Sequence, residues 1–178
     1  MRRVVIIGCS GSGKSTLARR LAERTGLPAI HLDRHYWRPG WTEPPRDEWQ
    51  AHAAALAAGD RWIIDGQYAS TLPARLARAD TLIFLDLPMP VCLFRVLRRT
   101  IAGYGRTRAE LPPDCPERFD WAFLQYIWNY RHTHRPRMLE IVAGFQGDKL
   151  VFTTPAEVAA WQGGRSYSGM GRPNLGKE

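Results

Sequence analysis

Cysteine is scarce in this sequence. Only Cys9, Cys92 and Cys115 occur, their number is odd, and no two of them are spaced as Cys-x-x-Cys. A disulfide framework needs paired cysteines and a structural zinc site needs close sets of cysteine and histidine, so neither is predicted. His132 and His134 form a His-x-His pair, but no third ligand lies at a suitable spacing. We therefore expect three reduced thiols and no zinc.

Long hydrophobic runs are also missing. No stretch of about eighteen apolar residues occurs, so no membrane-spanning helix is predicted. The N-terminal segment MRRVVIIGCS has only the short apolar run VVII before its glycines, which is too short for the apolar core of a secretory signal. We therefore expect a cytoplasmic protein that does not interact with membranes.

Lysine is rare as well. It occurs only at Lys14, Lys149 and Lys177, so arginine supplies the rest of the 25 basic side chains behind the net charge of +8. Two explanations compete, because arginine recognises phosphate groups well, whereas a GC-rich genome would raise arginine everywhere. A basic surface also attracts nucleic acid, but charge alone is weak evidence for such a partner. Only the positions of particular arginines are therefore informative.

The composition that remains is typical of a globular protein. The chain has 178 residues, of which 44% are hydrophobic and 24% charged, and this length suits one domain with a substantial core. The last stretch, GGRSYSGMGRPNLGKE, is typical of a flexible tail. We expect a single domain over residues 1–162, followed by a flexible C-terminal tail over 163–178.

Strands and helices alternate along the chain. Apolar runs predict buried strands at 4–7, 28–33, 62–65, 81–86 and 149–152. Capped or amphipathic stretches predict helices at 14–25, 46–58, 70–78, 88–99, 117–131, 136–143 and from Pro155. This order predicts an α/β fold with a parallel sheet covered on both faces. Ligands bind beyond the carboxyl ends of such strands, where Asp33, Asp65 and Asp86 would share one rim with the first glycine-rich loop.

The segment GCSGSGKS (8–15) fits the pattern G-x-x-x-x-G-K-[ST] and lies between an apolar strand and an amphipathic helix. Glycines let the backbone turn its N–H groups toward phosphate oxygens, and the helix N-terminus adds a positive end. Lys14 can reach the outer phosphates, and the hydroxyl of Ser15 can bind Mg²⁺. We predict binding of ATP or GTP with Mg²⁺, and the residues expected to contact the nucleotide are Gly8, Ser10, Gly11, Ser12, Gly13, Lys14, Ser15 and Thr16.

The sequence resembles adenylate-kinase-like P-loop kinases, and among them the small bacterial group called DNA topology modulation protein. The resemblance covers roughly residues 3–162 and is carried by IIGCSGSGKSTLARRLA, IHLDRHYWRPGW, WIIDGQYASTLPARLARADTLIFLDLP, CLFRVLRRT, GRTR and WNY (128–130). It implies a P-loop NTPase three-layer sandwich with a five-stranded parallel sheet, a helical lid and an acceptor-binding insertion. The insertion would comprise residues 34–60 and the lid residues 100–116.

The resemblance also implies a metal site at Asp65. This residue ends WIID before Gly66, like the Asp-Gly of adenylate kinases whose carboxylate holds Mg²⁺ through water, so we expect Asp65 and Ser15 at the metal. An aspartate at a strand end can instead cap the following turn, and Asp86 competes for the same role. Residues 153–155 would lie along the adenine.

Four arginines are candidates for the phosphates. Arg95 and Arg99 are spaced i, i+4 and resemble the arginine pair with which adenylate kinases hold nucleotide phosphates. Arg106 and Arg108 would extend from the lid. Phosphoryl transfer needs fixed positive charge around its transition state, and we expect Lys14, Arg99, Arg106 and Arg108 to supply it. The alternative for each arginine is a solvated basic surface.

The segment HLDRHYWRPGW (31–41) is the candidate acceptor site. A carboxylate at the end of the second strand suits an alcohol, whose proton Asp33 could accept or orient, and we expect Asp33 in both a catalytic and a binding role. Arg34, Trp37 and Trp41 would line the acceptor pocket. A nucleoside monophosphate would instead call for Arg34 and Arg38. The sequence does not choose between a nucleoside, a nucleotide and another metabolite.

Two functions of different classes follow. The first is an ATP-dependent phosphotransferase that uses Mg²⁺ and acts on a small-molecule acceptor. The second is a regulatory ATP-binding protein that affects DNA topology with little or no kinase turnover, which the name of the group suggests. Against the second, no helix-turn-helix, zinc finger or RNA-binding aromatic signature is present. A plain nucleotide hydrolase conflicts with the presence of a lid, because a lid excludes water.

Overall fold

The computed structural model describes residues 1–163, so the predicted tail lies outside the described residues from 164 on. The described chain alternates strands with helices, as the sequence predicts, and its one unexpected element is the short helix α2. In chain order the elements are β1 (Arg3–Gly8), α1 (Lys14–Thr25), β2 (Ala29–His31), α2 (Leu32–Tyr36), α3 (Arg46–Leu56), β3 (Trp62–Asp65), α4 (Leu72–Arg78), β4 (Thr81–Leu85), α5 (Met89–Gly103), α6 (Trp121–Thr133), α7 (Arg135–Gly144), β5 (Asp148–Phe152) and α8 (Pro155–Gln162).

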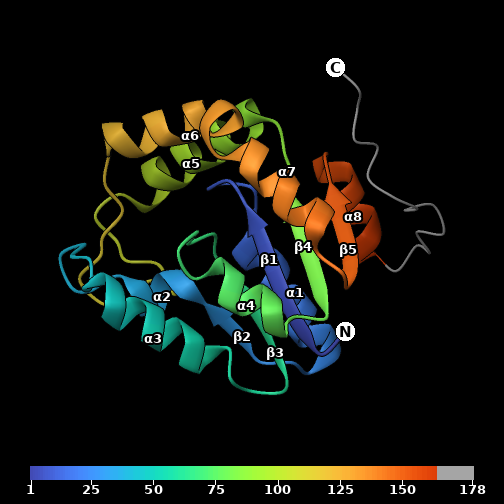
Figure 1. Ribbon diagram of the computed structural model, residues 1–178. Coiled ribbons are helices and arrows are strands. Elements are labelled where there is room, and N and C mark those ends of the chain that lie inside the picture. Colours follow the sequence, from blue (N-terminus) through green and yellow to red (C-terminus); the bar gives the residue numbers. More distant parts are fainter. Residues whose placement is uncertain (164–178) are drawn as a thin grey trace.

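The five strands form one parallel sheet in the order β2-β3-β1-β4-β5. The central strand β1 pairs with β3 and β4, whereas β2 and β5 are the edge strands. At least one helix joins each strand to the next, because parallel neighbours need a long crossover connection. Helices cover both faces of the sheet in Figure 1. The predicted three-layer α/β fold with a five-stranded parallel sheet is therefore confirmed.

The apolar run VVII forms a strand that is buried on both faces. Side chains alternate along a strand, so Val4 and Ile6 face one side of the sheet while Val5 and Ile7 face the other, and all four are fully buried. Each pair belongs to a separate hydrophobic cluster. A continuous apolar run is therefore what the centre of a covered parallel sheet requires.

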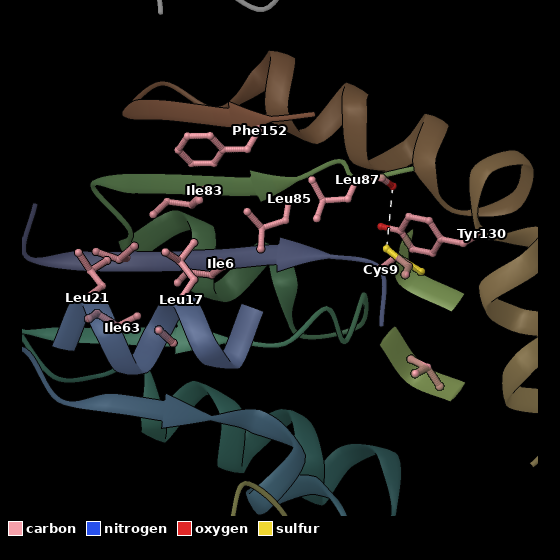
Figure 2. Close-up of a cluster of buried hydrophobic side chains, with 14 of the residues drawn as sticks. Ile6, Cys9, Leu17, Leu21, Ile63, Ile83, Leu85, Leu87, Tyr130 and Phe152 are labelled. Atoms are coloured by element: carbon pink, nitrogen blue, oxygen red, sulfur yellow. Dashed lines mark hydrogen bonds between the residues drawn. The ribbon is translucent and has the colours of Figure 1, made fainter. Parts of the chain in front are cut away.

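The two clusters are closed by different helices. In Figure 2, Leu17 and Leu21 of α1 point toward the sheet, with Leu17 beside Ile6, and Tyr130 of α6 lies near Cys9, which directly follows β1. Helix α5 contributes further buried side chains to this cluster. On the opposite face, buried side chains of α3, α4 and α7 close the second cluster, among them Trp49, Leu72 and Met138. The carboxyl ends of the strands lie between these two layers of helices.

The second strand is shorter than predicted. We expected a strand over 28–33, but β2 ends at His31 and the chain turns directly into α2. Leu32 is fully buried at the start of this helix and belongs to the cluster that contains Trp49. Asp33 therefore lies in the first turn of a helix and not at the end of a strand. The prediction was wrong because a short apolar run before an aspartate does not reveal where an edge strand stops pairing.

Residues 104–120 connect α5 to α6 and are called the lid segment below. Helix α5 continues to Gly103, so the irregular backbone begins at Tyr104. Isolated bridges join Tyr104 to Glu117 and Thr107 to Pro116, which brings the two ends of the segment together. Helix α6 starts later than predicted, because Asp120 caps it by accepting the backbone N–H of Phe123 at 3.0 Å. The lid segment itself consists of turns and bridges, and the helices lie on either side of it.

Within residues 1–163, every helix is too short or too polar to cross a lipid bilayer.

Candidate nucleotide and acceptor site

The predicted phosphate loop forms a tight turn between β1 and α1. The N–H of Ser12 donates to the carbonyl oxygen of Cys9 at 3.1 Å, and α1 begins at Lys14. The Lys14 ammonium folds back and donates to the carbonyl oxygens of Gly8 and Cys9, both at 2.9 Å. An ammonium group and the positive end of a helix therefore meet at this turn. Such an arrangement suits an anion.

The loop also holds a buried hydroxyl group without a partner. Ser12 is only 2% exposed, and its Oγ has no hydrogen-bond partner among the residues that the structure describes. An unpaired buried polar atom costs free energy, so its presence calls for an explanation. A phosphate oxygen could accept this hydrogen. The orphaned Ser12 hydroxyl therefore fits the predicted phosphate site.

Helix α5 supports the loop from the opposite side. Arg95 donates from a terminal guanidinium nitrogen to the carbonyl oxygen of Ser12 at 3.1 Å. Gly11 approaches the backbone of Cys92 so closely that a Cβ atom there would lie 2.3 Å from the Cys92 carbonyl oxygen. Arg95 thus lies at the phosphate loop, near the phosphates that it is predicted to hold, but in this structure it contacts the backbone of Ser12.

The predicted metal residues are in direct contact. Ser15 Oγ donates to Oδ2 of Asp65 at 2.7 Å, and Oδ1 of the same carboxylate is 2.5 Å from Nδ1 of His31. The hydrogen bond to Asp65 raises the pKa of His31 above its usual value, while burial opposes this shift. A hydroxyl and a carboxylate oxygen are the kind of ligand that Mg²⁺ prefers, so this pair fits the predicted metal.

The rival carboxylate, Asp86, is occupied elsewhere. Arg135 holds it with both Nε and a terminal guanidinium nitrogen, at 2.8 Å each. The pair lies in the wall of a pocket of about 210 Å³ beside the phosphate loop, together with Cys9, Tyr130 and Thr153. Asp86 therefore belongs to this pocket, and Asp65 is the carboxylate that contacts Ser15.

The carboxylate of Asp33 faces an aromatic hydroxyl. Tyr68 donates its phenolic hydrogen to Oδ1 of Asp33 at 2.7 Å. Burial raises the pKa of Tyr68, and the charge of Asp33 adds to the shift, so the phenol stays protonated. The backbone of Tyr68 has a φ of 26°, which is uncommon for a residue with a side chain. A residue held in such a conformation must be fixed by its surroundings.

Arg75 supplies that fixation. Its side chain is fully buried and donates to three successive carbonyl oxygens, those of Gly66, Gln67 and Tyr68, at 2.8–3.2 Å. Burial lowers the pKa of Arg75 to about 10, so the group remains charged at neutral pH. The loop after β3 is therefore held in place by one buried guanidinium group, and the Tyr68 hydroxyl is held against Asp33.

The other predicted acceptor residues lie in different surroundings. Trp37 and Trp41 pack edge to face with ring centroids 5.3 Å apart. Arg34 is exposed. Arg38, the alternative contact for a phosphate-bearing acceptor, forms an ion pair with Glu48 on α3. The two tryptophans thus form a small aromatic group beyond α2, while neither arginine faces Asp33 through a contact in the described structure.

The lid segment is closed onto the loop between α2 and α3. The indole N–H of Trp41 donates to the carbonyl oxygen of Pro116 at 3.1 Å, and the N–H of Gly40 donates to that of Asp114 at 2.9 Å. The thiol of Cys115 lies 3.3 Å from the carbonyl oxygen of Arg38. In Figure 1 the lid (yellow) accordingly meets the chain next to α2. Trp41 is therefore a lid contact in this structure.

The lid arginines are divided between two environments. Arg99 and Arg108 both approach the buried carboxylate of Glu117, with Nε atoms 3.1 Å and 2.5 Å from Oε1. Burial lowers the pKa of Arg99, and the nearby charge of Arg108 lowers it further. Arg106 is exposed. We call Glu117, Arg99, Arg108 and Thr100 the Glu117 cluster.

The fold therefore brings most of the predicted residues to one rim. The phosphate loop, Arg95, Ser15 and Asp65 form a continuous set of contacts, and Asp33 lies near enough to Arg99 for its charge to raise the pKa of that arginine. Arg34 and Arg106 are not part of this set. Thr16 is exposed on α1.

Four residues with evident roles at this rim were not predicted. His31 could have been found, because β2 and β3 pair in parallel and place His31 directly beside Asp65. Tyr68 and Arg75 have their roles because of the conformation of the loop after β3, and no local sequence pattern predicts that conformation. Glu117 stands between a proline and an arginine in an irregular segment, and its role becomes visible only when the lid is folded.

The chain is similar to known proteins over more than half of its length. A family model described as an AAA domain matches residues 4–110 of the chain. An uncharacterized protein of Bacillus subtilis (strain 168), YqaC, is 29% identical over 108 residues, which is 58% of this chain. The match spans 60% of the length of that relative.

Two solved structures share the fold at low identity. Shikimate kinase from Acinetobacter baumannii, in complex with shikimate, has a TM-score of 0.61 at 15% identity, covering 92% of this chain and 89% of its own. A gluconokinase from Sinorhizobium meliloti 1021 has a TM-score of 0.50 at 20% identity, covering 90% of this chain and 89% of its own. At these identities the likeness concerns the fold.

Proposed function

Because the chain belongs to the AAA domain family, whose model spans residues 4–110, we propose that it is an ATP-dependent phosphotransferase that acts on a small-molecule acceptor. Residues 1–162 would form one kinase-like domain, with an acceptor-binding insertion over 34–60 and a lid over 100–116. Proteins named as a shikimate kinase and a gluconokinase share this fold, which makes small hydroxyl-bearing compounds the first acceptors to test.

The observation that carries the proposal is the closed lid beside the phosphate loop. The lid segment is hydrogen-bonded to the insertion through Trp41 and Gly40, and Glu110 of the lid lies 4.0 Å from Arg19 on α1. A segment that bridges the insertion and the first helix would keep water from the phosphates. Water exclusion is useful to an enzyme that transfers a phosphoryl group and harmful to one that hydrolyses ATP.

The donor would be bound by the phosphate loop. Lys14 would leave the loop carbonyls and contact the outer phosphates, and the unpaired Ser12 hydroxyl would gain a phosphate oxygen as acceptor. Ser15 and Asp65 would hold Mg²⁺, which neutralises phosphate charge when it is bound. The pocket that contains Thr153 adjoins the loop and would take the base.

Asp33 would act on the acceptor. In the transfer, the acceptor oxygen forms a bond to the γ-phosphorus while the bond from that phosphorus to the bridging oxygen breaks, so ADP leaves. The hydroxyl proton of the acceptor passes to the Asp33 carboxylate. The hydrogen bond from Tyr68 keeps this carboxylate oriented before the acceptor binds. Arg99 and Arg108 would face the negative charge that spreads over the transferred group.

Labelled ATP tests this proposal. The γ-phosphoryl group of ATP is followed across a panel of sugars, small alcohols, nucleosides and nucleoside monophosphates. At least one acceptor should receive the label, and Lys14→Ala should abolish the transfer. Asp33→Asn should abolish it too while ATP affinity stays nearly unchanged, whereas an equal loss of ATP affinity would place Asp33 at the metal. Tight ATP binding without any transfer would favour the regulatory alternative.

A further inference from the structure

Glu117 is a buried carboxylate in the part of the molecule that we propose binds phosphate groups. The residue is only 5% exposed. Bringing a negative charge into such a place is costly, both because the carboxylate loses its water and because it opposes the binding of an anion. A carboxylate at this point therefore needs compensating partners, and the structure provides them.

The position of Glu117 is fixed through its backbone and its side chain. Its N–H donates to the carbonyl oxygen of Arg106 at 3.0 Å, and its own carbonyl oxygen accepts the N–H of Gly105 at 2.9 Å. The hydroxyl of Thr100, in the last turn of α5, donates to Oε2 at 3.2 Å. The carboxylate thus stands at the neck of the lid, where both ends of the lid segment meet α5.

Two guanidinium groups meet at this carboxylate, each through one edge. Arg99 and Arg108 approach Oε1 of Glu117 with their Nε atoms. Over residues 1–163, neither arginine hydrogen-bonds to the protein through its terminal nitrogens, and each Nε lies within ion-pair distance of Oε1 without hydrogen-bond geometry. Both groups therefore keep their outer, two-nitrogen edges available for a ligand.

The charges at this place do not cancel. Two positive groups share one carboxylate, and their mutual repulsion is visible in the pKa of Arg99, which burial lowers first and the Arg108 charge second, while Glu117 raises it. Without Glu117 the two arginines would separate. With it, the cluster carries one net positive charge and holds two guanidinium groups side by side.

The Glu117 cluster begins one helical turn beyond the contact of α5 with the phosphate loop. Arg95 contacts the loop at Ser12, and Arg99 follows one turn later on α5, about 6 Å along the helix axis. This offset is comparable to the spacing between the first and the outer phosphates of a nucleoside triphosphate. Lys14 and Arg95 would serve the phosphates within the loop, and the Glu117 cluster those beyond it.

We propose that Glu117 is a positioning residue, which holds Arg99 and Arg108 together so that both guanidinium groups contact the outer phosphates of a bound nucleoside triphosphate. The inference rests on the proposed function as far as nucleotide binding is concerned, and it does not depend on the acceptor. Glu117 itself does not touch the nucleotide. Its effect should therefore appear only through the two arginines and only with ligands that carry outer phosphates.

Calorimetric titration of Glu117→Gln with ATP and with AMP tests whether the effect of Glu117 depends on the outer phosphates. The loss of charge-assisted contacts should weaken ATP binding roughly ten- to a hundredfold and leave AMP binding within about twofold. Glu140→Gln is the matched control, because Glu140 is an exposed carboxylate on α7 and outside the lid segment. This control should bind ATP like the wild type. Equal losses for ATP and AMP would overturn the proposal.

A double-mutant cycle separates positioning from a structural role. If Glu117 acts through the arginines, Glu117→Gln should cost little further ATP affinity once Arg108 is replaced by alanine, whereas independent effects would add. Glu117→Asp, which keeps the charge, should restore most of the binding. Should Glu117→Gln fail to fold, Arg99→Ala and Arg108→Ala carry the comparison: each should weaken ATP binding and leave AMP binding within about twofold, and equal losses for ATP and AMP would refute the proposal. ATP binding without transfer to any acceptor would refute the phosphotransferase but not this inference.

Discussion

Replacing Gly11 by alanine tests how closely the phosphate loop depends on α5. Gly11 has a φ of 83°, and an added Cβ would lie 2.3 Å from the carbonyl oxygen of Cys92 and 2.9 Å from Cγ2 of Val96. A left-handed backbone costs a residue with a side chain about 1–2 kcal/mol. The overlap with the backbone of α5 adds about 1–3 kcal/mol, as overpacking does in a core. We therefore expect Gly11→Ala to lower the free energy of unfolding by about 2–5 kcal/mol.

Gly26 provides the matched control. This C-cap of α1 has a φ of 67°, but nothing lies within 4 Å of an added Cβ. Gly26→Ala should therefore cost only the backbone strain of about 1–2 kcal/mol. Urea denaturation followed by circular dichroism measures both costs, and titration with ATP measures the loop, since only Gly11→Ala should also weaken ATP binding. Equal stability losses in the two variants, with ATP affinity unchanged in both, would refute the reasoning.

Three further predictions concern other contacts. Tyr68→Phe removes the hydrogen bond to Asp33, worth about 1 kcal/mol, and should lower kcat/KM for the acceptor about fivefold without changing ATP affinity. Trp41→Phe removes the indole donor to Pro116 and should raise ATP hydrolysis in the absence of acceptor; an unchanged hydrolysis rate would show that this contact does not hold the lid. Burial acts to raise the pKa of Asp80, but hydrogen bonds from a neighbouring hydroxyl and two backbone N–H groups prevail and hold it below its usual 3.8. The resulting stability is present above pH 3.8 and lost as the pH falls through the lower, folded-state pKa, so Asp80→Asn should cost about 1 kcal/mol at pH 7 and progressively less as the pH falls below 3.8.

Much of the fold could be predicted, because its elements rest on local patterns. The run VVII before a glycine-rich turn could only be a buried strand, and Gly26 ends α1 in the left-handed conformation that the pattern predicts. The strand order was not predicted, because which parallel strands pair depends on segments far apart in the chain. Elements with strong periodicity and clear caps therefore lie where they were expected.

The limits of the prediction lie where distant segments decide the structure. Helix α2 replaces the end of the second strand because Leu32 packs into a core built by residues far along the chain. Trp41 was expected to face an acceptor, but its indole N–H contacts the lid at Pro116. No pattern within a few residues contains this information, because the partner lies 75 positions away.

The candidate site shows the same division. Lys14 and Ser15 could be named from the loop motif and Asp65 from the resemblance to adenylate kinases, and the structure places Ser15 and Asp65 in contact. Glu117 could not be named, since its meaning depends on two arginines that approach it from α5 and from the lid. Ligand-binding residues that belong to a sequence motif are thus easier to predict than residues that hold other ligand-binding side chains in position.

In the proposed reaction, the γ-phosphoryl group of ATP passes to a small acceptor and not to water. The most direct measurement is the partition of labelled phosphate between organic product and inorganic phosphate, with the wild-type protein, ATP, Mg²⁺ and an acceptor panel. We expect an acceptor with which most of the label enters an organic phosphate and ATP turnover rises above the rate of hydrolysis. Label that appears only as inorganic phosphate, at a rate no acceptor changes, would contradict it.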